Sequence, residues 1–158
     1  MSFKVPAGFR VAGVHCGIKR NPSKEDLTLV VADAPAVAGG VYTQNLVCAA
    51  PVIIDRTRTP SDAIRAVVVN SGNANACTGE QGMQDAEEMA RMAAEVCGAE
   101  AQQALVMSTG IIGHHLPMDK IATGISAAAE QPGATEEHWH EAARGILTTE
   151  KGIKTAVK

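Results

Sequence analysis

The sequence predicts a layered α/β fold, in which helices pack closely against β-sheet. The chain has 158 residues, of which 46% are hydrophobic but only 3% aromatic. Its core must therefore consist of small aliphatic side chains, which suit close contact between helix and sheet. Strand patterns come first, and strand and helix patterns then alternate. The length is that of one domain, so we expect a single domain over residues 1–158.

Strand patterns dominate the first half of the chain. Residues 6–19 are punctuated by glycines and predict one or two short strands or a surface loop. Residues 26–32, DLTLVVA, place Leu and Val at alternate positions and predict a strand. After a glycine turn, residues 41–44 and 51–55 predict two further strands, and residues 56–62, RTRTPSD, predict a polar loop.

The middle of the chain predicts a strand followed by a long helix. Residues 66–70 are almost all apolar, as in a strand buried on both faces, and residues 71–75 predict a turn. Residues 80–97 predict a helix because their apolar positions recur at spacings of three and four. These positions are Met83, Ala86, Ala90, Ala93 and Cys97.

The last third continues the alternation of strand and helix. Residues 104–107, ALVM, predict a buried strand, and residues 117–130 predict a helix that begins at a proline. Thr135 is placed to cap another helix, with two glutamates in its first turn. Residues 150–158 have the pattern of the beginning of another strand, so we expect the chain to be a fragment of a longer protein or one subunit of a larger assembly.

The segment 108–118, STGIIGHHLPM, directly follows the strand at residues 104–107. A strand that ends in a small hydroxyl pair and a glycine can present a hydroxyl and backbone N–H groups to a developing negative charge. Thr109 and Gly110 are therefore the candidate catalytic residues. The pattern by itself favours the alternative, an ordinary turn between a strand and a loop.

Composition and charge argue against several classes of protein. The formal net charge is -3 and the basic residues do not cluster, which disfavours a nucleic-acid partner. No apolar run approaches the length of about 20 residues that spans a bilayer. The first residues lack the apolar region of a signal peptide. We therefore expect a cytoplasmic protein without a membrane partner.

No metal site is expected. Adjacent histidines such as His114 and His115 do not easily converge on one ion, and we expect both to be solvated. Small neighbours predict buried thiols, and none of the cysteines has the spacing of a zinc ligand. The cysteines are Cys16, Cys48, Cys77 and Cys97. An activated thiolate at Cys77 is the less favoured alternative.

The Asn-rich segment 70–75 has two interpretations. Asn side chains tolerate left-handed turns and bind backbone groups, so we expect a scaffold beside Thr109 rather than a ligand site. The succession of strand, Gly/Asn-rich turn and helix over residues 66–97 also mimics a phosphate-binding unit. Neither G-x-G-x-x-G nor G-x-x-x-x-G-K-[ST] occurs there. A nucleotide-binding module and a non-catalytic protein that retains the fold are the alternative functions.

Three segments together resemble one enzyme family. They are residues 68–79, VVNSGNANACTG, residues 108–118, STGIIGHHLPM, and residues 146–150, ILTTE. Over nearly its whole length, the chain is similar to the N-terminal half of the bifunctional ornithine acetyltransferase family. Members of this family are also glutamate N-acetyltransferases of arginine biosynthesis.

The resemblance implies sheets sandwiched between helices, as in self-processing N-terminal hydrolases. It implies a precursor that cuts itself before a threonine, which becomes the nucleophile at the start of a beta chain. The acetyl group of N-acetylornithine then moves to this threonine and on to glutamate in a ping-pong reaction. The resemblance also implies a heterotetramer of two alpha and two beta chains and no cofactor, although some members use acetyl-CoA as a donor.

The resemblance assigns roles to two parts of this sequence. The hydroxyl residue and the glycine of the STG motif form the family's oxyanion hole, which corresponds to Thr109 and Gly110. In the family, one threonine of a TTD-type segment contacts the substrate. This threonine corresponds to either Thr148 or Thr149, and the resemblance does not distinguish the two. Here the segment reads TTEK. The family's cleavage motif, Ala-Thr-Met, does not occur, so we expect this portion to lie before the cleavage site and to be inactive alone.

Overall fold

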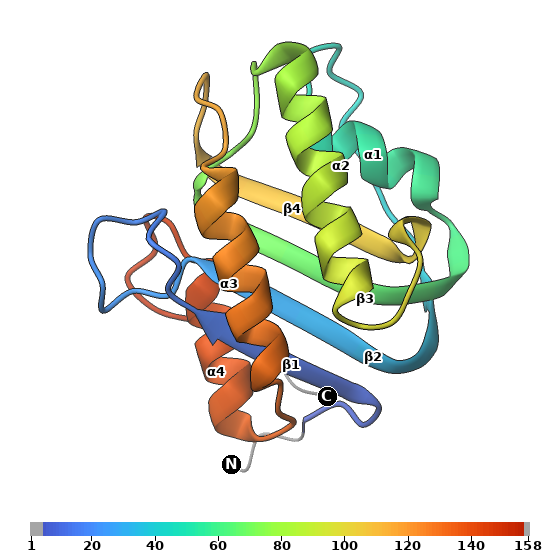
Figure 1. Cartoon of the computed structure of the whole chain (residues 1–158), viewed down its shortest axis with the longest axis vertical. Coiled ribbons are helices and arrows are strands. Elements are labelled where there is room, and N and C mark those ends of the chain that lie inside the picture. Colours follow the sequence, from blue (N-terminus) through green and yellow to red (C-terminus); the bar gives the residue numbers. More distant parts are fainter. Residues whose placement is uncertain (1–4, 157–158) are drawn as a thin grey trace.

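A computed structural model of the chain describes residues 5–156, which form a four-stranded sheet with helices on both faces (Figure 1). The strands are β1 (Phe9–Val14), β2 (Leu27–Ala38), β3 (Ser61–Asn73) and β4 (Ala104–Ile111). The helices are α1 (Ala50–Arg58), α2 (Gly79–Glu95), α3 (Met118–Glu130) and α4 (Glu136–Gly145), with a short 3₁₀ helix, η1 (Ala101–Gln103). The predicted α/β class is therefore confirmed.

The strands lie in sequence order across the sheet. β1, β2 and β3 are antiparallel neighbours, and β3 pairs with β4 in parallel through a crossover that contains α2. Leu29 of β2 pairs with Ala12 on one side and Val68 on the other, and Val68 pairs with Val106 of β4. One face of the sheet therefore carries a continuous apolar row.

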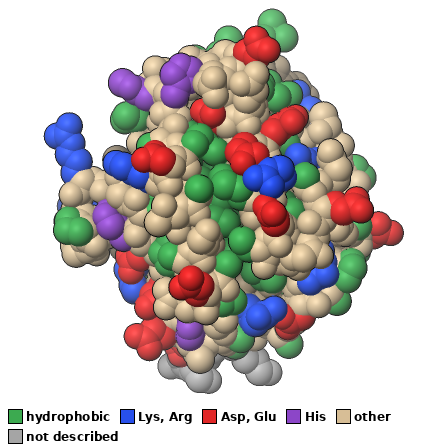
Figure 2. All heavy atoms as spheres, in the orientation of Figure 1, with side chains coloured by type: hydrophobic (Ala, Val, Ile, Leu, Met, Phe, Trp, Pro, Cys, Tyr) green, Lys and Arg blue, Asp and Glu red, His purple; other side chains and the backbone are tan. Residues whose placement is uncertain are grey.

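This apolar face packs against α2 and α3, which lie in front of the sheet in Figure 1. Ala86, Ala90 and Ala93 of α2 are fully buried, as their spacing predicts. Ile121 and Ile125 of α3 fill the space over β1 and β2. Figure 2 shows acidic and basic side chains interspersed on the outer surface of this layer, with hydrophobic side chains visible between them.

α4 lies on the opposite face of the sheet and contacts mainly β1 and β2. The hydroxyl of Thr28 donates to the carbonyl of Ala142 at 2.7 Å. Gly13 lets the helix approach closely, because a Cβ there would overlap the carbonyl of Glu141. Met107 of β4 belongs to the same face and is 47% exposed. The described residues thus leave the β4 side of this face partly uncovered.

The structure corrects three expectations in the first half of the chain. Residues 41–44 have no regular structure, and residues 51–55 lie in α1 rather than in a strand. Pro51 occupies the first turn of this helix, where its missing N–H is harmless, and the β-branched residues that follow it mimic a strand. Of the predicted loop at residues 56–62, the beginning ends α1 and the last two residues start β3.

The remaining elements agree with the predictions apart from their ends, with two exceptions at residues 71–75 and 150–158. Thr135 caps α4 by accepting the N–H of His138. β3 continues through residues 71–73, which the sequence predicts as a turn, because it stays paired with β4 there. Residues 150–156 form no strand, and residues 157–158 lie outside the described part of the chain.

Two charged side chains of α1 bind the outer edge of β4. Asp55 Oδ1 accepts the N–H of Val106 at 3.0 Å, and Arg58 Nη1 donates to Ala104 O at 2.7 Å. Asp55 is 5% exposed and Arg58 9% exposed. Burial raises the pKa of Asp55 to about 6, although the N–H of Val106 and the charge of Arg58 act in the other direction.

We expect Asp55 to weaken folding as the pH rises from about 4 to about 6. In this window the folded protein must release a proton that the unfolded chain has already lost. The difference between an ordinary value of 3.8 and about 6 corresponds to roughly 3 kcal/mol. Asp55→Asn keeps an acceptor for Val106 but does not titrate. Urea denaturation at pH 4 and pH 7 should show a smaller decline for Asp55→Asn, and equal declines would contradict this account.

Candidate functional site

β3 and β4 approach each other closely at their C-terminal ends, where two glycines are register partners. Gly72 has a φ of +115° and Gly110 a φ of +138°. A side chain on Gly110 would overlap the backbone of Gly72 and Asn73. Both positions therefore require glycine, and the pairing becomes irregular just after them. The result is a tight corner beside Thr109.

The Asn-rich segment supports this corner. Asn73 Nδ2 donates to the carbonyls of His114 and His115 at 3.2 and 3.0 Å, which ties the loop after β4 to β3. Asn75 Nδ2 donates to Gly82 O near the start of α2 at 2.8 Å. These contacts confirm the predicted scaffold role. The side-chain amides already donate to backbone carbonyls, which argues against a phosphate-binding role for this segment.

One buried carboxylate holds the loop between β1 and β2. Asp26 Oδ1 accepts the N–H of Cys16 at 2.7 Å, and Oδ2 accepts the N–H groups of Gly17 and Lys19 at 3.2 and 2.9 Å. Burial acts to raise the pKa of Asp26, but these donors outweigh it and hold the pKa below its ordinary value. Asp26 is therefore a charged anchor that fixes the shape of the loop.

Ser71 of β3 connects this loop to the end of α4. Its N–H donates to Asp26 O at 2.8 Å, and its hydroxyl donates to Gly145 O at 2.5 Å. An ion pair between Arg144 and Glu25, with Nε and Nη2 each 2.8 Å from Oε1, adds a second connection. These contacts direct the segment after α4 toward the ends of β3 and β4.

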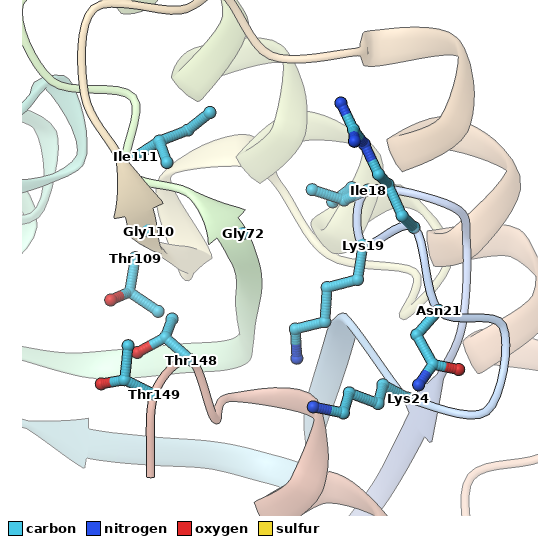
Figure 3. Close-up of a pocket in the computed structure, with 11 residues that line it drawn as sticks. Ile18, Lys19, Asn21, Lys24, Gly72, Thr109, Gly110, Ile111, Thr148 and Thr149 are labelled. Carbon is cyan, nitrogen blue, oxygen red and sulfur yellow. The ribbon is translucent and has the colours of Figure 1, made fainter.

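The ends of β3 and β4, the loop between β1 and β2, and the segment after α4 together line a pocket of about 560 Å³ (Figure 3). The volume lies within the range of small-molecule sites, about 300–1,000 Å³. In Figure 1, the loop between β1 and β2 (blue) and the segment after α4 (red) lie beside the ends of β3 and β4. The pocket therefore forms where segments from the beginning, middle and end of the chain meet.

All four residues that the sequence singles out line this pocket. Figure 3 shows Thr109, Thr148 and Thr149 together on one side, and Gly110 follows Thr109 at the corner. Glu150 Oε2 accepts the N–H of Thr148 at 3.0 Å and its hydroxyl at 3.4 Å. Within residues 5–156 the hydroxyl of Thr149 makes no hydrogen bond. The structure thus brings together two segments that are far apart in the sequence.

Residues that the sequence analysis did not single out form the other side of the pocket. Lys19 and Lys24 extend into it from the loop between β1 and β2 (Figure 3). Ile18 and Ile111 add apolar surface. The sequence signal was weak, because the run KRNPSK at residues 19–24 has the composition of an ordinary exposed loop.

The expectation that the cysteines are buried is wrong. Cys77 is exposed, and the others are half-buried, namely Cys16, Cys48 and Cys97. Burial is the main cause that raises the pKa of Cys16 to about 12 and the pKa of Cys97 above its ordinary value. A raised pKa makes these two thiols poor nucleophiles at neutral pH.

The described part of the chain offers no metal-binding cluster of three or more His, Cys, Asp or Glu residues. His114 and His115 are exposed, as expected. Across residues 5–156, every helix is too short or too polar to cross a membrane.

The fold and the pocket define a layered α/β protein with a cavity of small-molecule size at the C-terminal end of a parallel strand pair. A model of the ArgJ family matches residues 10–158, and the chain belongs to this family. The arginine biosynthesis bifunctional protein ArgJ of Symbiobacterium thermophilum is 51% identical over 152 residues, which are 96% of this chain. The protein of the same name from Rhodopirellula baltica is 47% identical over 154 residues, or 98% of the chain. The chain spans only 37% of the length of each relative.

Two solved structures share the fold. The crystal structure of arginine biosynthesis bifunctional protein ArgJ from Bacillus halodurans superposes with a TM-score of 0.85 at 40% identity, covering 92% of this chain and 74% of that chain. The structure of ornithine acetyltransferase from Mycobacterium tuberculosis, complexed with ornithine, superposes with a TM-score of 0.88 at 40% identity. This superposition covers 92% of the present chain and 78% of the Mycobacterium tuberculosis chain.

We expect Asp26→Asn to loosen the loop that forms one side of the pocket. An amide has one acceptor oxygen in place of two, and its NH₂ group faces the loop's N–H donors. The unfolding free energy should fall by roughly 2–3 kcal/mol, and amide exchange at residues 16–19 should accelerate. Hydrogen-exchange mass spectrometry measures the second effect. Asp33→Asn is the control, since Asp33 is an exposed partner of Arg10, at 2.8 Å. Unchanged exchange at residues 16–19 in Asp26→Asn would show that Asp26 does not hold the loop.

Proposed function

We propose that the chain is the alpha-chain portion of an enzyme that transfers an acetyl group from N-acetylornithine to glutamate. The observation that carries this proposal is the convergence of Thr109, Gly110, Thr148 and Thr149 on one pocket. The solved relative named ornithine acetyltransferase, with its bound ornithine, supports the substrate class. Because the chain spans 37% of its curated relatives, a companion portion supplies the rest of the active site.

In this proposal, Thr109 and Gly110 stabilise the transition state. Attack on the acetyl carbonyl turns its oxygen into an oxyanion, and donors fixed in advance stabilise the new charge. Thr109 supplies its hydroxyl and Gly110 its backbone N–H. The glycine corner supports this role, because the close packing of Gly110 on the backbone of Gly72 and Asn73 holds the Gly110 backbone in place before a substrate arrives.

The proposed nucleophile is a threonine at the start of the companion beta chain. Its free α-amine, with a reference pKa near 8, takes the hydroxyl proton. The hydroxyl oxygen bonds to the acetyl carbon, the amide C–N bond breaks, and ornithine leaves with the proton on its amine. The amine of glutamate then attacks the threonine ester, which releases N-acetylglutamate and restores the hydroxyl. This two-step exchange is a ping-pong reaction.

The partly uncovered face of the sheet supports the position of the companion chain. Met107 and Thr109 belong to the same face of β4, and Met107 is 47% exposed. A chain that covers Met107 also passes close to Thr109. We propose that the beta chain packs here, that self-cleavage of a common precursor produces it, and that two copies of each chain form a heterotetramer.

The remaining elements of the proposal concern ligands and location. Thr148 and Thr149 contact the substrate, and the unbonded hydroxyl of Thr149 supports a contact from that residue. Acetyl-CoA is a further possible donor, and the reaction as written needs no cofactor. The enzyme acts in the cytoplasm, without nucleic acid or membrane.

We expect Thr109→Ala in the full-length protein to lower kcat for acetyl transfer by about 100-fold or more, as loss of one oxyanion donor does. KM should change little, because the oxyanion exists only in the transition state. Steady-state kinetics with N-acetylornithine and glutamate measures both constants. Thr109→Ser keeps a hydroxyl and should retain much more activity. An unchanged kcat in Thr109→Ala would remove this residue from the mechanism.

We also expect the full-length protein to cut itself. Mass spectrometry of the purified product should find two pieces, the second beginning with threonine, since a free N-terminal amine is the proposed base. Replacing that threonine by alanine should leave one uncut chain. An intact wild-type chain with full acetyl-transfer activity would rule out this nucleophile.

A further inference from the structure

The side of the pocket that faces the threonines carries positive charge. Lys19 and Lys24 extend into the pocket, and Arg20 also lines it. The lining contains no acidic residue. Figure 3 shows hydroxyl groups on one side of the cavity and the two ammonium groups on the other. The cavity therefore has a polar, neutral end beside Thr109 and a cationic end.

The two ammonium groups lack a carboxylate partner within residues 5–156. Lys19 Nζ donates to a backbone carbonyl, that of Glu25, at 2.6 Å, and Lys24 Nζ forms no hydrogen bond or ion pair in this part of the chain. The neighbouring carboxylates are already engaged, Glu25 with Arg144 and Glu150 with the backbone of Thr148. An anion that enters the pocket thus meets two ammonium groups that form no ion pair with a described carboxylate.

Lys19 is half-buried, whereas Lys24 is exposed. Burial is the main cause that lowers the pKa of Lys19, and the nearby charge of Lys24 acts in the same direction. The charges of Asp26 and Glu25 oppose this lowering. Asp26 is completely buried and directed at the N–H groups of the loop, so it does not occupy the pocket.

The backbone that carries the two lysines is held in place before any ligand arrives. His15 Nδ1 lies 2.8 Å from Lys24 O, and Lys120 Nζ of α3 donates to Gly17 O at 2.9 Å. Together with the Asp26 contacts, these bonds fix residues 15–19 and the backbone of Lys24 near the end of the loop. A site that is ordered in advance loses less conformational freedom on binding.

We propose that Lys19 and Lys24 form a subsite for the α-carboxylate of the amino-acid substrate, an inference that rests on the function proposed above. In an N-acetylated α-amino acid the carboxylate carbon is three bonds from the acetyl carbonyl carbon. Thr109 and the two lysines line the same pocket of about 560 Å³, so one small molecule of this kind can present its carbonyl to Thr109 and its carboxylate to the lysines. The phosphates of acetyl-CoA are separated from the acetyl group by a long arm, so they fit this short pocket less well.

The test uses the full-length protein and its Lys19→Met and Lys24→Met variants, which keep much of the apolar stem. N-acetylornithine and its carboxamide are the two ligands, and isothermal calorimetry gives the Kd of each. We expect each variant to bind N-acetylornithine about 10- to 100-fold more weakly, the range of a hydrogen bond to a charged group. Binding of the carboxamide should change by less than about threefold, because it presents no charge to either lysine.

Two further proteins separate charge recognition from a general effect. Lys19→Arg keeps the positive charge and should recover part of the preference for carboxylate over carboxamide. Arg91→Met removes one positive charge from the exposed surface of α2, away from the pocket, and should bind both ligands like the wild type. Kinetics should agree, with KM for N-acetylornithine and for glutamate rising while kcat changes little.

Several results would overturn the proposal. Equal weakening of both ligands would show that the lysines support the loop and do not read the carboxylate. Unchanged binding of N-acetylornithine in both variants would remove the subsite. If the lysine variants lost affinity only for acetyl-CoA, the lysines would bind its phosphates and not the carboxylate of the amino acid. A wild-type protein that prefers the carboxylate but transfers no acetyl group would refute the proposed reaction alone, whereas equal binding of the two ligands would refute the subsite.

Discussion

The buried carboxylate of Asp26 is the interaction on which the pocket depends. The carboxylate accepts hydrogen bonds from the N–H groups of Cys16, Gly17 and Lys19, and the backbone carbonyl of Asp26 accepts the N–H of Ser71. One residue thus joins the loop after β1, the start of β2 and the end of β3. A charge can stay in such a place only because several donors replace the water that it loses.

Several polar side chains beside the pocket bind backbone groups of the protein and are therefore not available to a ligand. Ser71 holds the end of α4, and Asn73 and Asn75 hold backbone carbonyls on either side of the glycine corner. The polar side chains that line the pocket are three threonines, two lysines, Arg20 and Asn21. This division explains why the pocket has a neutral end and a cationic end, and why both rest on rigid elements.

The spacing of apolar residues predicted the helices that pack against the sheet, because burial of one side of a helix requires apolar residues at regular intervals. The spacing of Ala86, Ala90 and Ala93 marked the buried side of α2. It failed for α1, where the β-branched residues after Pro51 mimic a strand although the segment packs as a helix against β4 and α2. Thr109 and Gly110 were found through a motif and a family resemblance. Lys19 and Lys24 were missed because exposed cations in a loop have no distinctive pattern.

The sequence by itself determined the local features: most of the strands, the long helices and the family to which the chain belongs. Only the tertiary structure decided which segments meet, since hydrogen bonds such as that from Ser71 to Gly145 join residues with no sequence relation. Charge shows the difference most clearly. Lys19 is one of 14 basic residues in the sequence, and its half-buried position and direction come from a carboxylate on the next strand.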